Sequence, residues 1–139
     1  MLCNNFEASD VENSSFLFFI CSKTSGTIDS EGSAVRELIL EVSKHEGEQK
    51  SDFLQRILTS GSPKAKVLKC ADRISNMISL GYVTDCKFIE RYCDETEYYI
   101  LPIALEVDYN MYQELINLII TRRKYLEDSG YIESKKKTV

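Results

Sequence analysis

The sequence predicts an all-α protein: a helical bundle of about five helices that follows an irregular N-terminal arm. Apolar residues recur at the i, i+3, i+4 and i+7 spacing of an amphipathic helix from residue 33 onward. Glycine, proline and serine interrupt this pattern at regular places, as they do at helix ends. No stretch sustains the period-two alternation of a half-buried strand. A chain of 139 residues suits a single domain.

The helical segments follow from the apolar spacing and from the residues that begin and end each one. Ser62 and Pro63 suit an N-cap and a first helical position, because proline has no N–H to satisfy there. Gly81 and Gly130 suit positions just after a helix, and Pro102 is expected to kink the helix that contains it. The predicted helices span residues 33–45, 51–60, 63–80, 84–107 and 110–129.

Composition limits the classes of partner and the compartment. The formal net charge is −5 and the sequence pI is about 5.0, which give no electrostatic basis for nucleic-acid binding. The apolar run at residues 16–21 is much too short to span a membrane, so no membrane association is expected. Five cysteines without a CxxC pair suggest reduced thiols and a cytoplasmic protein.

We divide the chain into an irregular arm (residues 1–32), a helical body (33–130) and a basic tail (131–139). The tail carries Lys135, Lys136 and Lys137 and is expected to be solvated and frayed. Short polar and small residues surround the one apolar island of the arm, and the sustained helical period begins only after it.

The predicted helix at residues 63–80 carries a polar stripe. Lys69, Asp72, Arg73 and Asn76 fall at i, i+3, i+4 and i+7, which places them on one side of the helix. The opposite side is apolar and is expected to be the buried one; it comprises Ala65, Val67, Leu68, Ala71, Ile74 and Ile78. The stripe then either faces solvent, with an ordinary Lys69–Asp72 pair, or lines a pocket.

The run KVLKCADRISNM at residues 66–77 adds a second line of argument. It resembles the K-x-A-D-R-x-x-N-M/L segment of the HD-domain superfamily, in particular the (p)ppGpp hydrolase domains of the RelA/SpoT type. The segments VRELILEVSK (residues 35–44), FIERY (88–92) and ETEYYILPIA (95–104) are similar to the flanking helices of such domains, in the same order. The resemblance covers about residues 33–107 and implies an HD-domain-like helical bundle.

The resemblance implies a metal-dependent phosphohydrolase that acts on guanosine polyphosphates. Such domains hold a divalent cation, usually Mn²⁺, with two histidine-containing motifs and a later aspartate, which Asp72 matches. By the same resemblance Asn76 and Ser79 contact the nucleoside. Lys69 and Arg73 supply charges near the metal or the phosphates.

The sequence departs from the family in its histidines. It contains one histidine, His45, which follows the position of the family's His-Asp doublet and is expected to be an exposed residue in the last turn of a helix. One aspartate provides too few ligands for a catalytic cation. We therefore assign no catalytic residue, and expect an N-terminally truncated or degenerate HD-domain protein that is inactive alone.

A second interpretation is a non-catalytic helical binding or regulatory module. A partial bundle exposes apolar surface, which favours self-association or a partner. The aromatic residues within the stretch 88–99 are the expected patch.

Overall fold

The computed structural model describes residues 30–137, and this part of the chain is helical without a strand. The prediction of an all-α helical bundle is confirmed. The chain divides into two compact units, Met1–Ser43 and Lys44–Val139, which are described separately. Most of the predicted arm, residues 1–29, lies outside the described residues. The last residues assigned to the arm, from Ser30 onward, belong to a helix.

Helix α2 (Ser30–Val42) is the described element of the first unit. It begins and ends about three residues earlier than predicted. The Ser43 hydroxyl donates to the Ile39 carbonyl at 2.6 Å, and the Ser43 N–H donates to the Leu40 carbonyl at 3.4 Å. These bonds satisfy carbonyls of the last turn, so the helix ends before His45. His45 is exposed, as expected, but it lies outside the helix.

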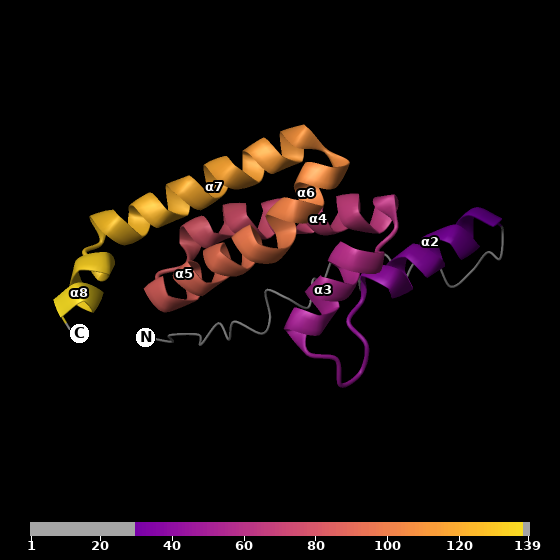
Figure 1. The fold of residues 1–139 in the computed structure, drawn as a ribbon, viewed down its shortest axis with the longest axis horizontal. Coiled ribbons are helices and arrows are strands. Elements are labelled where there is room, and N and C mark those ends of the chain that lie inside the picture. Colours follow the sequence, from indigo (N-terminus) through magenta and orange to yellow (C-terminus); the bar gives the residue numbers. More distant parts are fainter. Residues whose placement is uncertain (1–29, 138–139) are drawn as a thin grey trace, which may run out of the picture. The chain divides into compact units, whose positions relative to one another are not determined.

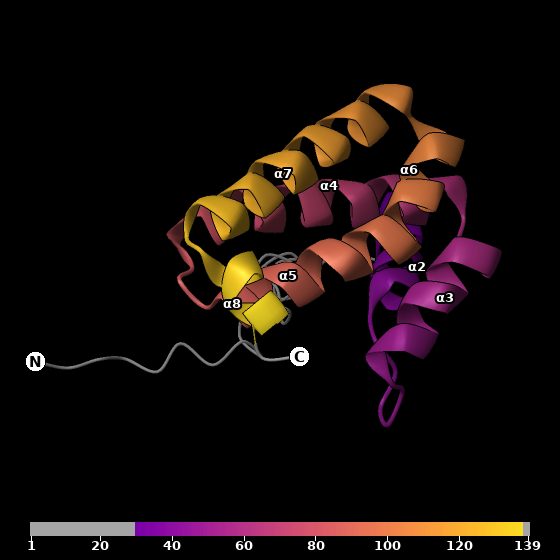
Figure 2. The ribbon, with the colours of Figure 1, turned by 60° about the vertical axis from the view of Figure 1, so that its left-hand side comes forward.

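The second unit forms the bundle, in which α7 runs beside α4, α5 and α6 (Figures 1 and 2). Side chains from these helices and from α3 make one apolar core, with Leu54, Ile57, Met77, Ile89 and Leu115 almost without exposed surface. Its elements are α3 (Lys50–Ser60), α4 (Pro63–Ser79), the 3-10 turn η1 (Leu80–Tyr82), α5 (Cys86–Glu95), the π-helical turn η2 (Thr96–Ile100), α6 (Leu101–Val107), α7 (Tyr109–Asp128) and α8 (Tyr131–Lys137).

Side-chain caps begin the main helices of the bundle. The Ser62 hydroxyl accepts from the Ala65 N–H at 3.2 Å, which confirms the cap predicted for α4. Asp85 caps α5 in the same way. The Asp108 carboxylate caps α7 by accepting the N–H groups of Asn110 and Met111 at 2.8 and 3.0 Å. Each cap satisfies N–H groups that have no partner within the helix.

The far end of α4 is held by a side chain from another helix. Arg122 on α7 donates to the carbonyls of Met77 and Ile78 at 3.1 and 3.0 Å. Gly81 does not end the helix in a left-handed conformation, because α4 continues into η1. Gly130 does adopt positive φ, at 74°, where it separates α7 from α8.

The predicted long helix at residues 84–107 is present, but it contains a change of backbone register. The Leu101 N–H donates to the Thr96 carbonyl, five residues earlier, so residues 96–100 form a π-helical turn before Pro102. A proline ring clashes with the carbonyl four residues before it in a regular helix, and a wider turn at this place relieves that clash. In place of the kink expected at Pro102, the helix contains a π-helical turn just before it.

The buried face of α4 agrees only in part with the predicted one, since Ala65 is buried and Ile74 packs against the core. Val67, Ala71 and Ile78, expected in the core, are exposed, whereas Arg73 is only 2% exposed. Lys66 is also buried, and its ammonium contacts both carboxylate oxygens of Glu106 on α6 at 2.8 Å. The helix presents its buried side through Ala65, Lys66, Cys70, Arg73 and Met77. Two of these five residues are charged. A prediction that places only apolar residues in the core therefore selects a different side of the helix.

The basic tail is helical as far as Lys137, which corrects the expectation of a frayed segment. Within α8, the Lys135 ammonium contacts both carboxylate oxygens of Glu90 on α5 at 2.9 and 2.8 Å. The Tyr131 hydroxyl donates to the same carboxylate at 3.0 Å. Tyr131 and Ile132 pack against the core, which gives this short helix an apolar attachment as well.

Replacing the α7 cap tests this account of the helix ends. Asp108→Ala is expected to lower the free energy of unfolding by about 1 kcal/mol, because two N–H groups lose their acceptor. Urea unfolding followed by circular dichroism measures the change. Glu114→Ala, which removes an exposed carboxylate from the same helix, is the control and is expected to stay within about 0.5 kcal/mol of the parent. Equal losses in the two variants would contradict the role of the cap.

Candidate functional site

Three segments meet around the buried guanidinium of Arg73: helix α3, the polar stripe of α4, and the junction of α5 with η2. We call this group of side chains the Arg73 cluster. Its members are Lys50, Phe53, Lys69, Asp72, Arg73, Asn76, Tyr92, Glu95 and Thr96.

Arg73 lies at the centre of the cluster. Its Nη2 donates to Glu95 Oε1 at 2.7 Å, and its Nη1 donates to the Thr96 hydroxyl at 3.3 Å. The guanidinium carbon lies 4.2 Å from the centroid of the Tyr92 ring. A buried cation is tolerated only when it has such partners, because removal from water costs several kcal/mol. The Nε of Arg73 is buried and has no hydrogen-bond partner in the described part of the chain.

Lys69 and Asp72 form a pair beside Arg73. The Lys69 ammonium donates to Asp72 Oδ2 at 3.1 Å and lies 5.2 Å from the centroid of the Phe53 ring. Burial lowers the pKa of Lys69, and the negative charge of Asp72 opposes this shift. Both side chains retain some exposure, so this edge of the cluster is accessible from solvent.

Asn76 turns toward Tyr92. Burial raises the pKa of the Tyr92 phenol, while the Arg73 charge and a hydrogen bond from the Asn76 side chain act in the opposite direction. The Asn76 amide thus lies beside the Tyr92 phenol. The structure thus brings Lys69, Asp72, Arg73 and Asn76 together, with Arg73 in the core.

Ser79, the remaining residue predicted for the site, is not part of the cluster. It is exposed at the last position of α4, and its hydroxyl donates to the Ser75 carbonyl at 3.1 Å. Its hydroxyl therefore bonds within its own helix.

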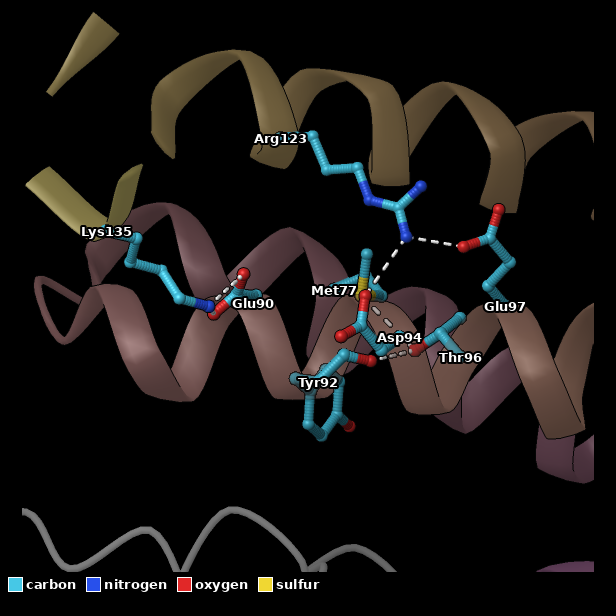
Figure 3. A network of polar contacts seen from close by, with 8 residues as sticks. All are labelled: Met77, Glu90, Tyr92, Asp94, Thr96, Glu97, Arg123 and Lys135. Carbon is cyan, nitrogen blue, oxygen red and sulfur yellow. Dashed lines mark hydrogen bonds and ion pairs between the residues drawn. The ribbon is translucent and has the colours of Figure 1, made fainter. Parts of the chain in front are cut away.

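Thr96 joins the cluster to the core (Figure 3). Its hydroxyl donates to the Tyr92 carbonyl at 2.6 Å and lies 3.7 Å from the Met77 sulfur. On the outer side of η2, Arg123 of α7 pairs with both Asp94 and Glu97. The Arg123 contacts hold α7 against the π-helical turn, and so fix the segment that carries Glu95 and Thr96.

The cluster includes residues that the predicted site lacked. Glu95 and Thr96 lie within the segment 95–104, which resembles a flanking helix of the family, but no spacing pattern places them against Arg73, more than 20 residues earlier. Lys50 on α3 also pairs with Glu95, at 2.8 Å from Oε2. Lys50 begins its helix without a recognisable motif, and no sequence signal identifies it.

The Arg73 cluster does not fit a divalent cation. The carboxylates of Asp72 and Glu95 are paired with Lys69, Lys50 and Arg73, so the cationic groups outnumber the anionic ones. Within residues 30–137, no group of three His, Cys, Asp or Glu side chains is placed to hold a metal ion. The described residues alone therefore do not supply the Mn²⁺ site that the resemblance implies, and we derive no chemical step through a metal.

Two cysteines of the bundle are part of its core. Cys70 and Cys93 are fully buried in the core, and burial raises the pKa of their thiols to about 12 and about 11. Thiols with such pKa values are protonated and unreactive at neutral pH. Cys70 therefore acts as a small buried apolar residue.

The predicted aromatic patch is only partly exposed. Phe88 and Tyr92 belong to the core, while Tyr98 is well exposed on η2 and Tyr99 is half-buried. The exposed side of α4, with Val67 and Ile78, adds apolar surface that the sequence had assigned to the core. Across residues 30–137, no helix is both long and apolar enough to cross a membrane.

Comparison with known proteins returns no assignment. No family model matches the sequence. No curated protein matches it either.

Substitution of Arg73 tests whether the cluster organises the bundle. Arg73→Ala is expected to lower the free energy of unfolding by about 3–5 kcal/mol, because it leaves a cavity and removes the principal counter-ion of Glu95. Urea unfolding measures the loss. Arg91→Ala, at an exposed position of α5, is expected to change it by less than about 0.5 kcal/mol.

The size-matched variant Arg73→Met separates packing from charge. It fills most of the volume, and Glu95 keeps Lys50 as a partner, so its loss is expected to be smaller than that of Arg73→Ala. If Arg73→Ala and Arg91→Ala proved equally stable, the central role of Arg73 would be refuted.

Proposed function

We propose that this chain is a partial or degenerate relative of the HD-domain phosphohydrolases that binds a guanosine polyphosphate or a related nucleotide and does not hydrolyse it alone. The family assignment rests on the resemblance of residues 33–107. The binding role rests on one observation: Lys50, Lys69 and Arg73 outnumber the carboxylates of Asp72 and Glu95 in a cluster that reaches the surface.

An excess of positive charge at a partly buried site favours a phosphorylated ligand. Ammonium and guanidinium groups bind phosphate oxygens through charge-assisted hydrogen bonds, and a partly desolvated site strengthens them. Lys69 has a lowered pKa because of burial, and an anion beside it restores the environment that its charged form prefers. By the resemblance, the neighbouring Asn76 amide, which is half-buried, would contact the nucleoside.

The absence of hydrolysis follows from the same residues. A catalytic divalent cation needs several protein ligands, and Asp72, the one residue that matches a family ligand, is held by Lys69. The cytoplasm, where guanosine polyphosphates are made, is the compartment that suits this function. Asp72 is then a binding and positioning group.

Calorimetric titration with ppGpp, with and without Mn²⁺, tests this proposal. Binding is expected in both conditions, and Lys69→Ala is expected to weaken it about tenfold, equivalent to about 1.4 kcal/mol. Lys64→Ala is the matched control, because Lys64 is an exposed lysine at the start of the same helix. Equal affinity of the Lys69 and Lys64 variants would contradict the binding site.

Product analysis of the same mixtures tests the absence of hydrolysis. No release of pyrophosphate is expected. Release that depends on Mn²⁺ and is abolished by Asp72→Ala would overturn the non-catalytic assignment and make Asp72 a metal ligand.

A second candidate function, a self-associating helical module, is favoured by the exposed side of α4. Val67, Ala71 and Ile78 recur along this side, and Ile78 is 52% exposed. A second copy of the chain that packs the same side against it would bury this apolar stripe, with the small Ala71 allowing the helices to approach closely.

Light scattering coupled to size exclusion decides between a monomer and a dimer. Self-association predicts a mass about twice the 15.9 kDa of one chain. Ile78→Glu is expected to yield the monomer, whereas Ile120→Glu, at an exposed isoleucine of α7, is expected to remain a dimer. A parent protein that is monomeric at every concentration would exclude this second function.

A further inference from the structure

The carboxylate of Glu95 is held between two cations that come from different helices. Its Oε1 accepts from Arg73 Nη2 on α4 at 2.7 Å, and its Oε2 lies 2.8 Å from Lys50 Nζ on α3. Both cations also lie near the ring of Tyr92, at 4.2 and 5.4 Å from its centroid. Each carboxylate oxygen therefore has its own cation, and Tyr92 helps to position both.

This arrangement is the one that a bound oxyanion adopts. Two oxygens of a phosphate, like those of a carboxylate, can bind a guanidinium and an ammonium at the same time. Lys69, the third cation of the cluster, lies on the same helix as Arg73 one turn earlier and is paired with Asp72. The buried Nε of Arg73, without a partner, shows that Glu95 and Thr96 do not use the full donor capacity of the guanidinium.

Side-chain exposure decreases from Lys50 through Glu95 to Arg73. The side chain of Lys50 is 35% exposed, that of Glu95 17% and that of Arg73 2%. An anion from solvent therefore meets Lys50 first and reaches Arg73 only where the Glu95 carboxylate now lies. Glu95, at the last position of α5, can leave by rotation of its side chain without unwinding η2.

We propose that Glu95 is an internal anion that competes with a phosphate for Lys50 and Arg73, and so limits the affinity of the Arg73 cluster for phosphorylated ligands. The identity of the ligand as a nucleotide rests on the proposed function; the competition by Glu95 concerns inorganic anions as well. Phosphate binding breaks the Lys50–Glu95 and Arg73–Glu95 contacts and replaces them with contacts to the ligand. No covalent change is involved.

The test is the affinity of Glu95→Gln for inorganic pyrophosphate, measured by calorimetry at low ionic strength. This variant removes the competing charge and keeps the side-chain length, so it is expected to bind pyrophosphate about tenfold more tightly than the parent. Glu97→Gln is the matched control. It removes the same charge two residues later, from a carboxylate that pairs with Arg123 and not with Lys50 or Arg73. An equal gain in both variants, or no gain in Glu95→Gln, would overturn the proposal.

A measurement on the parent protein covers the case in which Glu95→Gln fails to fold. With ¹³C-labelled glutamate, added pyrophosphate is expected to shift the side-chain carboxyl resonance of Glu95 and to leave that of Glu48 unchanged. Glu48 is a suitable reference because it is paired with Arg56 in the same unit. If calorimetry shows saturable binding of pyrophosphate and the Glu95 resonance does not move, the competition is refuted.

Guanosine polyphosphate in the same titrations separates this inference from the proposed function. If Glu95→Gln binds pyrophosphate more tightly but neither protein prefers the nucleotide, the competition stands and the nucleotide function fails. If the parent binds the nucleotide and Glu95→Gln binds nucleotide and pyrophosphate no more tightly, the proposed function stands and the competition fails.

Discussion

The burial of one guanidinium is the constraint on which the bundle depends. Arg73 occupies a core position of α4, where its charge must be neutralised and its N–H groups must find acceptors. Glu95 and Thr96 meet that requirement for Nη2 and Nη1 from the α5–η2 junction, while Nε has no partner in the described part of the chain. The Tyr92 ring covers the guanidinium. Because these partners are far from Arg73 in sequence, the interaction fixes how α4 packs against the second half of the chain.

Local sequence signals were sufficient to predict the helices. Which side of α4 is buried depends on tertiary contacts. The Ser62 cap and the end of α7 just before Gly130 are properties of short segments, and both were predicted correctly. The buried side of α4 was predicted only in part, because a count of apolar residues treats Lys66 and Arg73 as surface groups. Their burial depends on Glu106 and Glu95, whose positions only the tertiary structure provides.

The candidate site likewise contains residues that helical spacing predicts and residues that only the tertiary structure places there. A helical period is sufficient to place Lys69, Asp72, Arg73 and Asn76 on adjoining parts of one helix, and these four do lie together. Their roles differ, because Arg73 is fully buried while Lys69 and Asp72 reach the surface. Ser79 continues the same stripe in sequence, yet it lies at the exposed end of the helix. Lys50 and Glu95 complete the charge balance from segments whose proximity no spacing rule predicts.

The π-helical turn at Thr96–Ile100 has a consequence for how this chain tolerates length changes. Such a turn accommodates one residue more than a regular helical path over the same distance. Deleting one residue within it would restore a regular α-helical path, and the residues after it would keep nearly the same orientation, with Ile103 and Ala104 still facing the core. Pro102 would then lie inside a regular helix, where its ring clashes with the carbonyl four residues before it. A chain that lost the extra residue is therefore expected to lose the proline as well.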